Sequence, residues 1–121
     1  MEIMKKILLI ILFCLWASVG FAESVNFSWI PNTESDLAGY RIYYGETQGT
    51  NYTNVVTYDY LIPESDGRMH GTVSGLIAEH TYYFVCTAFD TSNNESSYSN
   101  EVSTTVQNTE PPNTPIDLRI N

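Results

Sequence analysis

The feature that most limits the fold of this chain is a series of short alternating runs separated by turn residues. In one run every second side chain is apolar or aromatic: Tyr82, Phe84, Cys86 and Ala88. Successive side chains of a strand point to opposite faces, so this run predicts a strand with one buried face. Such runs predict strands over 24–30, 39–45, 52–60, 69–76, 82–89 and 99–106, with no useful helical period after Ala22. Short strands with turn signals between them are typical of an antiparallel sandwich or barrel.

The first 22 residues predict a secretory signal peptide. Lys5 and Lys6 precede the unbroken apolar run 7–16, and residues 20–22 place small side chains at the two positions that signal peptidase reads. The apolar run is shorter than the roughly 20 residues of a membrane span. An uncleaved N-terminal anchor is the alternative. We therefore expect a secreted or extracytoplasmic protein.

Charge and cysteine content narrow the class of partner and the source of stability. Removal of Glu2, Lys5 and Lys6 with the signal peptide changes the net charge from −9 to −10. Nucleic acid and anionic membranes are bound by clustered Lys or Arg, so neither is an expected partner. Cys14 leaves with the signal peptide, so Cys86 has no partner for an intrachain disulfide. The hydrophobic core must then hold the domain together.

Several segments, in this order and at these spacings, resemble a fibronectin type III domain of the bacterial type. Trp29 ends an early strand, as the core tryptophan of that family does, and 36–44 resembles the strand that follows. Gly75-Leu76, with Tyr82 six residues after the leucine, resembles the family's tyrosine corner, in which the ring is buried and its hydroxyl bonds to the backbone. The resemblance covers about residues 24–106 and implies an all-β, immunoglobulin-like antiparallel β-sandwich. The expected core is Trp29, Tyr40, Ile42, Leu76, Tyr82, Phe84 and Cys86.

The sequence departs from the family in two places. Residues 78–80, at the corner, are Ala-Glu-His where the family usually has Pro-Gly, and this departure concerns the geometry of the turn. Only Glu23 and Ser24 precede the strand that carries Trp29, so the family's first strand is missing at the N-terminal end. A segment that resembles such an opening strand, 111–120, lies at the opposite end of the domain.

The C-terminal tail therefore has three interpretations. Residues 107–114 are polar and contain Pro111-Pro112, so they read as a linker at the start of the tail (107–121), which follows the domain (23–106). The tail is the stub of a further repeat, folds back on its own domain, or adds as a strand to a neighbouring chain. Eight residues span at most about 28 Å, roughly the length of a sandwich, so the fold-back path is strained. We favour the stub or a loose tail.

The sequence predicts no enzyme. His80 and Cys86 suggest a base and a nucleophile, but Cys86 has the same parity as the buried Phe84. A catalytic thiol needs exposure and a nearby cation that favours the thiolate. No acid/base pair and no glycine-rich phosphate loop emerges elsewhere, so we expect no catalytic residue and no cofactor.

Metal binding is not expected either. Met69, His70 and His80 lack the clustered cysteines or acids of a metal site. Two acidic loops, 59–66 and 90–95, lack the ordered spacing of a calcium loop. We interpret both loops as solvated surface.

A candidate interaction face follows from parity. If Tyr82, Phe84 and Cys86 point inward, their neighbours point outward. Aromatic side chains on such a face favour a protein interface or stack on sugar rings, although they can also serve only to stabilise the sheet. The predicted face consists of Tyr43, Tyr83, Val85 and Phe89.

Together these features predict an exported, non-catalytic binding or spacer module that contacts an extracellular protein or a surface. One alternative is a carbohydrate-binding accessory module with Tyr43 and Tyr83 as stacking platforms. Another is a structural subunit that assembles weakly with itself through the tail, 107–121. In each case the expected partner is an extracellular protein, a glycan or a second copy, without nucleic acid and without membrane contact after signal cleavage.

Overall fold

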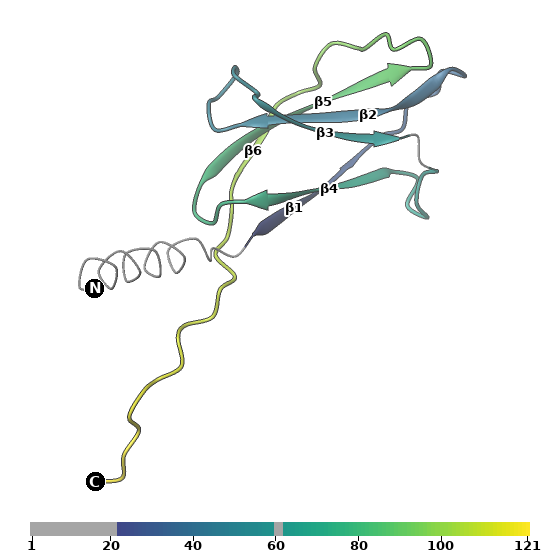
Figure 1. Ribbon diagram of the computed structural model, residues 1–121. Helices are drawn as coiled ribbons and strands as arrows, with labels where there is room; N and C mark the ends of the chain where they lie inside the picture. Colours follow the sequence, from purple (N-terminus) through teal and green to yellow (C-terminus); the bar gives the residue numbers. More distant parts are fainter. Residues whose placement is uncertain (1–21, 60–61) are drawn as a thin grey trace, which may run out of the picture.

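Two antiparallel sheets make up the described part of the chain (Figure 1). The structure is a computed structural model that describes residues 22–59 and 62–121. The predicted signal peptide, 1–22, lies outside the described residues except for Ala22. The six strands are β1 (Glu23–Trp29), β2 (Leu37–Gly45), β3 (Asn54–Asp59), β4 (Met69–Leu76), β5 (Thr81–Asp90) and β6 (Val102–Thr105).

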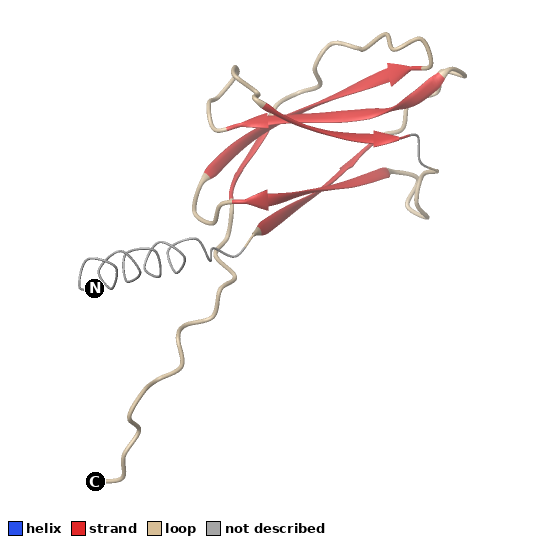
Figure 2. Ribbon diagram, viewed as in Figure 1, coloured by secondary structure: helices blue, strands red, loops and turns tan. Residues whose placement is uncertain are grey.

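The sheets contain different numbers of strands. β1 pairs with β4, and the second sheet has the order β3-β2-β5-β6. Figure 2 shows strands joined by loops, and the described residues contain no helix. Among them there is accordingly no helical segment that could cross a membrane. The two antiparallel sheets confirm the expected all-β, immunoglobulin-like antiparallel β-sandwich. The sheet that holds β1 has two described strands, in agreement with the expected loss of the family's first strand.

The core lies between the facing sides of the two sheets. Its buried cluster consists of Ile42, Val73, Leu76, Tyr82, Phe84 and Val106. Five of the residues expected in the core are buried, namely Tyr40, Ile42, Leu76, Tyr82 and Phe84. Aromatic rings join the layers: Phe27 lies 4.7 Å from Phe84 between ring centroids, and Trp29 lies 5.2 Å from Tyr40. Burial of such large apolar surfaces is the main stabilising term for a domain without disulfides.

Trp29 and Cys86 differ from the expectation of a fully dry interior. Both are only half-buried and pack against the buried cluster from its margin. The reason is the two-stranded sheet: no described strand lies beyond β1, so the interior stays open on that side.

The tyrosine corner forms at the β4–β5 connection, as its sequence predicts. The hydroxyl of Tyr82 accepts a hydrogen bond from the Ile77 backbone N–H at 3.1 Å while its ring is buried. Glu79, in the place of the family's glycine, adopts a φ of 68°. Its N–H donates to the carbonyl of Val106 at 2.7 Å, which ties the corner to the end of the last strand. A residue that carries a Cβ is strained in this left-handed region.

Glu79→Gly should therefore stabilise the domain. Relief of the left-handed strain should raise the free energy of unfolding by about 1–2 kcal/mol. The extra freedom of glycine in the unfolded chain should lower the free energy of unfolding by about 0.4–1 kcal/mol. Urea denaturation should show a free energy of unfolding higher by about 0.5–1 kcal/mol. Ala78→Gly is the matched control, because Ala78 does not have a positive φ. It should destabilise the domain, and equal effects of the two variants would contradict the strain at Glu79.

Candidate interaction face

The outer face of the four-stranded sheet carries the residues that the alternation predicted to point outward. β2 and β5 pair so that Tyr43 lies opposite Val85 and Gly45 opposite Tyr83. Ile42, the inward neighbour of Tyr43, pairs with Cys86. The register thus places Tyr43, Tyr83, Val85 and Phe89 on the side of the sheet away from β1 and β4.

Val85 is a correction to the predicted face. Only 4% of it is exposed, so it cannot serve as an accessible contact. The segment 96–101 crosses this part of the face: Tyr98 packs on Tyr43, beside Val85, and Ser99 donates its N–H to the carbonyl of Cys86 at 2.8 Å. Strand parity identifies the face of a residue, but a crossing loop decides whether that residue reaches water.

Phe89 is engaged within the chain. The guanidinium of Arg41 lies 4.1 Å from the centre of its ring, a cation–π distance. Arg41 also forms an ion pair with Glu95 at 3.3 Å and donates to the side chain of Asn93 at 3.2 Å. Phe89 is half-buried, and its outward ring face carries a cation.

Glu95 connects three strand residues on the outer face. Its Oε1 accepts hydrogen bonds from the hydroxyls of Tyr43 and Thr87, both at 2.6 Å, and pairs with Arg41. The bond from Thr87, followed by that from Tyr43, lowers the pKa of Glu95 from its ordinary value near 4.5. The hydrogen bond between Tyr43 and Glu95 also raises the pKa of Tyr43. The Glu95 carboxylate thereby fixes the position of the Tyr43 ring.

Three tyrosines gather next to this carboxylate, and we call Tyr43, Tyr52 and Tyr98 the tyrosine cluster. The ring of Tyr98 lies 5.6 Å from that of Tyr43 and 5.4 Å from that of Tyr52, between centroids. The Tyr52 hydroxyl donates to Glu101, which also accepts the Gly49 N–H at 2.8 Å. The hydrogen bond to Glu101 is the main cause that raises the pKa of Tyr52 to about 12. Tyr98 itself is 55% exposed.

Two serines explain how Tyr98 reaches this face. The Ser96 N–H donates to the Ala88 carbonyl at 2.8 Å, and the Ser96 hydroxyl accepts the Ala88 N–H at 3.0 Å. Ser99 does the same for Cys86, with its hydroxyl 2.9 Å from the Cys86 nitrogen. Hydroxyl oxygens thus replace strand carbonyls along the edge of β5, which lets the chain between them bulge outward. For this reason the last strand begins at Val102. The sequence had predicted that it would begin at Ser99.

Sequence reasoning missed Tyr52, Tyr98 and Glu101 as parts of a surface site. Tyr98 lies in a segment without regular alternation, so parity assigned it to no face. Glu95 appeared only as part of an acidic loop, because its contact with Tyr43 joins residues 52 positions apart. The Ser-x-x-Ser spacing beside a predicted strand was the signal that could have located the bulge.

Ser99→Ala should destabilise the domain by about 1 kcal/mol, because the Cys86 N–H loses its acceptor. Thermal unfolding checks the loss. Ser97→Ala is the matched control, since no described residue hydrogen-bonds to that hydroxyl, and its effect should stay within about 0.5 kcal/mol. If the two variants unfold at the same temperature, the hydroxyl of Ser99 does not hold the segment.

The Glu95 carboxylate should make a specific contribution to acid unfolding. A lowered pKa means that the folded state stabilises the ionised form more than the unfolded chain does. This stabilisation is complete above the ordinary pKa near 4.5 and is lost as the pH falls through the lower folded-state pKa. Glu95→Gln should therefore be less stable than the wild type at neutral pH, with a smaller fall in melting temperature on acidification.

The control for this pH series is Glu34→Gln, at an exposed carboxylate that accepts no hydrogen bond from the described residues. Its melting temperature should follow that of the wild type across the acid range. Parallel curves for Glu95→Gln and the wild type would contradict the proposed role of the carboxylate.

The residues considered for chemistry lie apart. Cys86 is half-buried, and burial raises the pKa of its thiol to about 11. His80 bonds to Glu46 through Nδ1 at 2.6 Å and precedes Cys86 by six residues, about 20 Å along an extended strand. The thiol is therefore protonated at neutral pH and has no imidazole beside it.

The acidic loops use their carboxylates internally. Asp90 accepts the backbone N–H groups of Ser92 and Asn94 at 3.0 and 2.8 Å, and the Asn94 side chain at 3.0 Å. Asp66 accepts the Arg68 N–H at 2.9 Å and bonds to the His70 ring at 2.8 Å. Over residues 22–59 and 62–121, no three His, Cys, Asp or Glu side chains come together in a way that could hold a metal ion.

Comparison with known proteins rests on structure. No protein-family model and no curated protein matches the sequence. The structure is similar to the third fibronectin III domain of the human KIAA0343 protein, with a TM-score of 0.57 and 20% sequence identity. The match covers 77% of this chain and 78% of that domain's chain. Taken with the two antiparallel sheets and the tyrosine corner, this likeness shows that the chain has the fold of a fibronectin type III domain.

Proposed function

We propose that this protein is an exported, non-catalytic binding module that contacts an extracellular protein through the tyrosine cluster. The observation that carries the proposal is the ordered, partly exposed arrangement of Tyr43, Tyr52 and Tyr98 on the outer face of the four-stranded sheet. The fibronectin type III fold supports a generic binding or spacer role, but a fold alone does not name a ligand. The surface itself therefore has to supply the argument.

The tyrosine cluster is already ordered for binding. Glu95 and Glu101 hold the hydroxyls of Tyr43 and Tyr52, so these rings have lost their freedom on folding. A partner then meets a lower entropic cost than it would with mobile side chains. Tyr98 projects between them, and Val55, opposite Tyr43 in the β2–β3 register, adds exposed apolar surface. Tyrosines in such settings are enriched among the residues that dominate protein interfaces.

The geometry favours a protein over a glycan. Sugars stack on flat aromatic faces, whereas Tyr98 is inclined by 60° to Tyr43 and by 86° to Tyr52. The rings therefore form a ridge and not a platform. Tyr83, the second stacking residue of the carbohydrate alternative, lies opposite Gly45 and outside the tyrosine cluster.

A non-catalytic role is supported by the state of the only thiol in residues 22–121. Cys86 has a raised pKa, and its surroundings supply no cation that would favour a thiolate. The hydrogen bonds of the outer face join the Glu95 carboxylate to the hydroxyls of Tyr43 and Thr87 and to Arg41, an arrangement that orients the Tyr43 ring.

Site-specific photo-crosslinking in the producing cells tests the proposal. Benzoylphenylalanine in place of Tyr98 should give a discrete crosslinked protein, whereas the same group in place of Tyr83, the matched control on this face, should not. With the captured partner purified, Tyr98→Ala should weaken binding by about tenfold or more, as expected for a central aromatic contact. Tyr83→Ala should bind as the wild type does.

Two outcomes would reject the proposal. One is the absence of any crosslinked protein at position 98; the other is equal crosslinking at positions 98 and 83. Retention on an insoluble polysaccharide that is lost in Tyr43→Ala would support the carbohydrate-binding alternative instead.

A further inference from the structure

β1 has a free edge. It pairs with β4 along Glu23–Trp29, and no described strand pairs with its other side. The backbone groups on that side are thus available to a further strand, and such edges are templates for strand addition. A third strand at this position would complete the smaller sheet.

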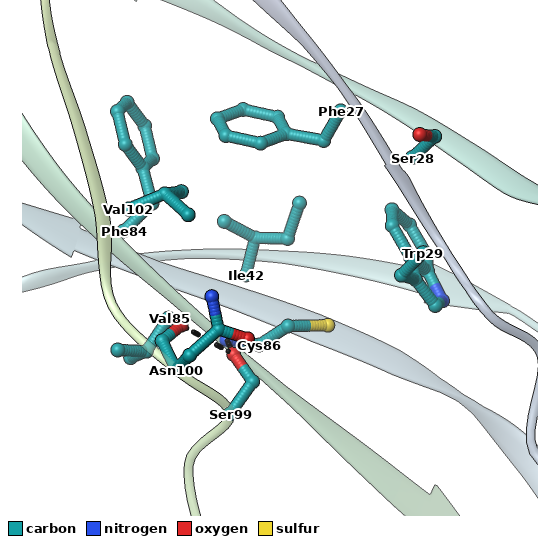
Figure 3. Close-up of a pocket in the computed structure, with 10 residues that line it drawn as sticks. All are labelled: Phe27, Ser28, Trp29, Ile42, Phe84, Val85, Cys86, Ser99, Asn100 and Val102. Carbon is teal, nitrogen blue, oxygen red and sulfur yellow. Dashed lines mark hydrogen bonds between the residues drawn. The ribbon is translucent and has the colours of Figure 1, made fainter.

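An apolar pocket of about 140 Å³ opens between the sheets on the side of β1 and the segment leading into β6. Figure 3 shows Phe27, Trp29, Phe84 and Val102 arranged around Ile42 at this opening. Val102 is 46% exposed although Phe84, its partner in the β5–β6 register, is buried. An apolar cavity of about this size holds a benzene-sized group, which is comparable to one branched aliphatic side chain.

The C-terminal tail carries side chains that suit this pocket. Ile116, Leu118 and Ile120 alternate along the chain and are 91%, 96% and 102% exposed. In an extended strand all three would lie on one face. Figure 1 shows the tail leaving the sandwich, and no described hydrogen bond joins residues beyond Glu110 to the sandwich. An exposed apolar row of this kind indicates a contact surface.

An antiparallel strand of the tail on its own β1 would be strained. The Thr109 hydroxyl and N–H donate to the Glu23 carboxylate at 2.7 and 3.2 Å, which anchors the tail at the beginning of β1. An antiparallel strand has to begin beside Trp29, six residue steps or about 20 Å from Glu23. The six residue steps from Thr109 to Pro115 reach at most about 20–22 Å, so this path needs a fully stretched linker. Pro111-Pro112 favours an extended path away from the anchor over a tight reversal.

We propose that residues 115–121 of one copy of this chain add as a strand to the free edge of β1 in a second copy. Leu118, in the middle of the apolar row, would enter the pocket beside Phe27 and Trp29, and Ile116 would pack at its margin, along the edge of β1 that no described strand covers. Each copy offers one tail and one acceptor edge, so the contact is heterologous and can close a ring or extend a filament. This interaction uses the space between the sheets, and so it stands apart from the binding proposed for the tyrosine cluster.

Net charge sets the salt dependence of this association. Residues 23–121 carry a net charge of −10, whereas one Asp and one Arg balance within 115–121. Copies therefore repel each other as whole molecules, although the joined segment is neutral. Added salt screens this repulsion, so association should strengthen as ionic strength rises.

Fluorescence of Trp29 tests the contact directly, because Trp29 is the sole tryptophan of residues 23–121. Residues 23–114 serve as the acceptor, and a synthetic peptide of residues 112–121 as the donor. The peptide should change the Trp29 emission in a saturable way. A peptide with Ile116→Asp and Leu118→Asp should bind at least about tenfold more weakly, whereas Asp117→Asn, on the other face of the segment, should bind equally.

The acceptor side has its own variant. Val102→Asp places a charge at the pocket in a half-exposed position, so the domain keeps its fold while peptide binding is lost. Circular dichroism verifies the fold of this variant. The absence of any fluorescence change up to millimolar peptide would overturn the proposal.

Sedimentation of residues 23–121 completes the test. The average mass should rise with concentration and with salt, and this rise should disappear in residues 23–114. A monomer at all concentrations whose melting temperature falls on truncation would show that the tail pairs with its own domain, contrary to the proposal. Self-association that survives the Ile116→Asp, Leu118→Asp double change would also overturn it.

Discussion

The register between β2 and β5 is the constraint on which the other features of the sandwich depend. It sets Ile42 opposite Cys86 and Tyr44 opposite Phe84, so the inner faces of both central strands enter one interior. The same pairing aligns Tyr43 with Val85 on the outer face. A shift of one residue would exchange the two faces, exposing the core and burying the polar network around Glu95. Burial of the inner side chains therefore specifies the outer surface as well.

One described sheet has four strands and the other has two, and this difference gives the molecule two kinds of surface. The outer face of the four-stranded sheet is covered and ordered by Glu95, Glu101 and the crossing segment that carries Tyr98. The side of β1 is open, which leaves Trp29 half-buried at the margin of the core. One surface is ordered before any partner arrives, and the other has a backbone edge and apolar groups that no described strand covers.

Much of the fold could be predicted because its signals are local. The strand predicted over 69–76 has those bounds in the structure, and the hydroxyl of Tyr82 meets the backbone five residues upstream. The candidate face was harder to predict. Val85 has the outward parity of Tyr43 but is buried, because parity does not report a segment that crosses the sheet. Tyr98, the most exposed member of the tyrosine cluster, lies outside any strand and offered no period to interpret.

The sequence by itself determined the order of the strands along the chain, the inner and outer faces of the strands that carry Tyr43 and Tyr82, the corner at Tyr82 and a strand-like segment in the tail. Each depends on residues close together in the chain, where strand geometry relates spacing to direction. Tertiary structure alone decided that Glu95 holds Tyr43, that Tyr98 packs on Tyr43 and that a pocket opens beside β1. These features join segments far apart in the chain, and the same local patterns are compatible with other ways of bringing those segments together.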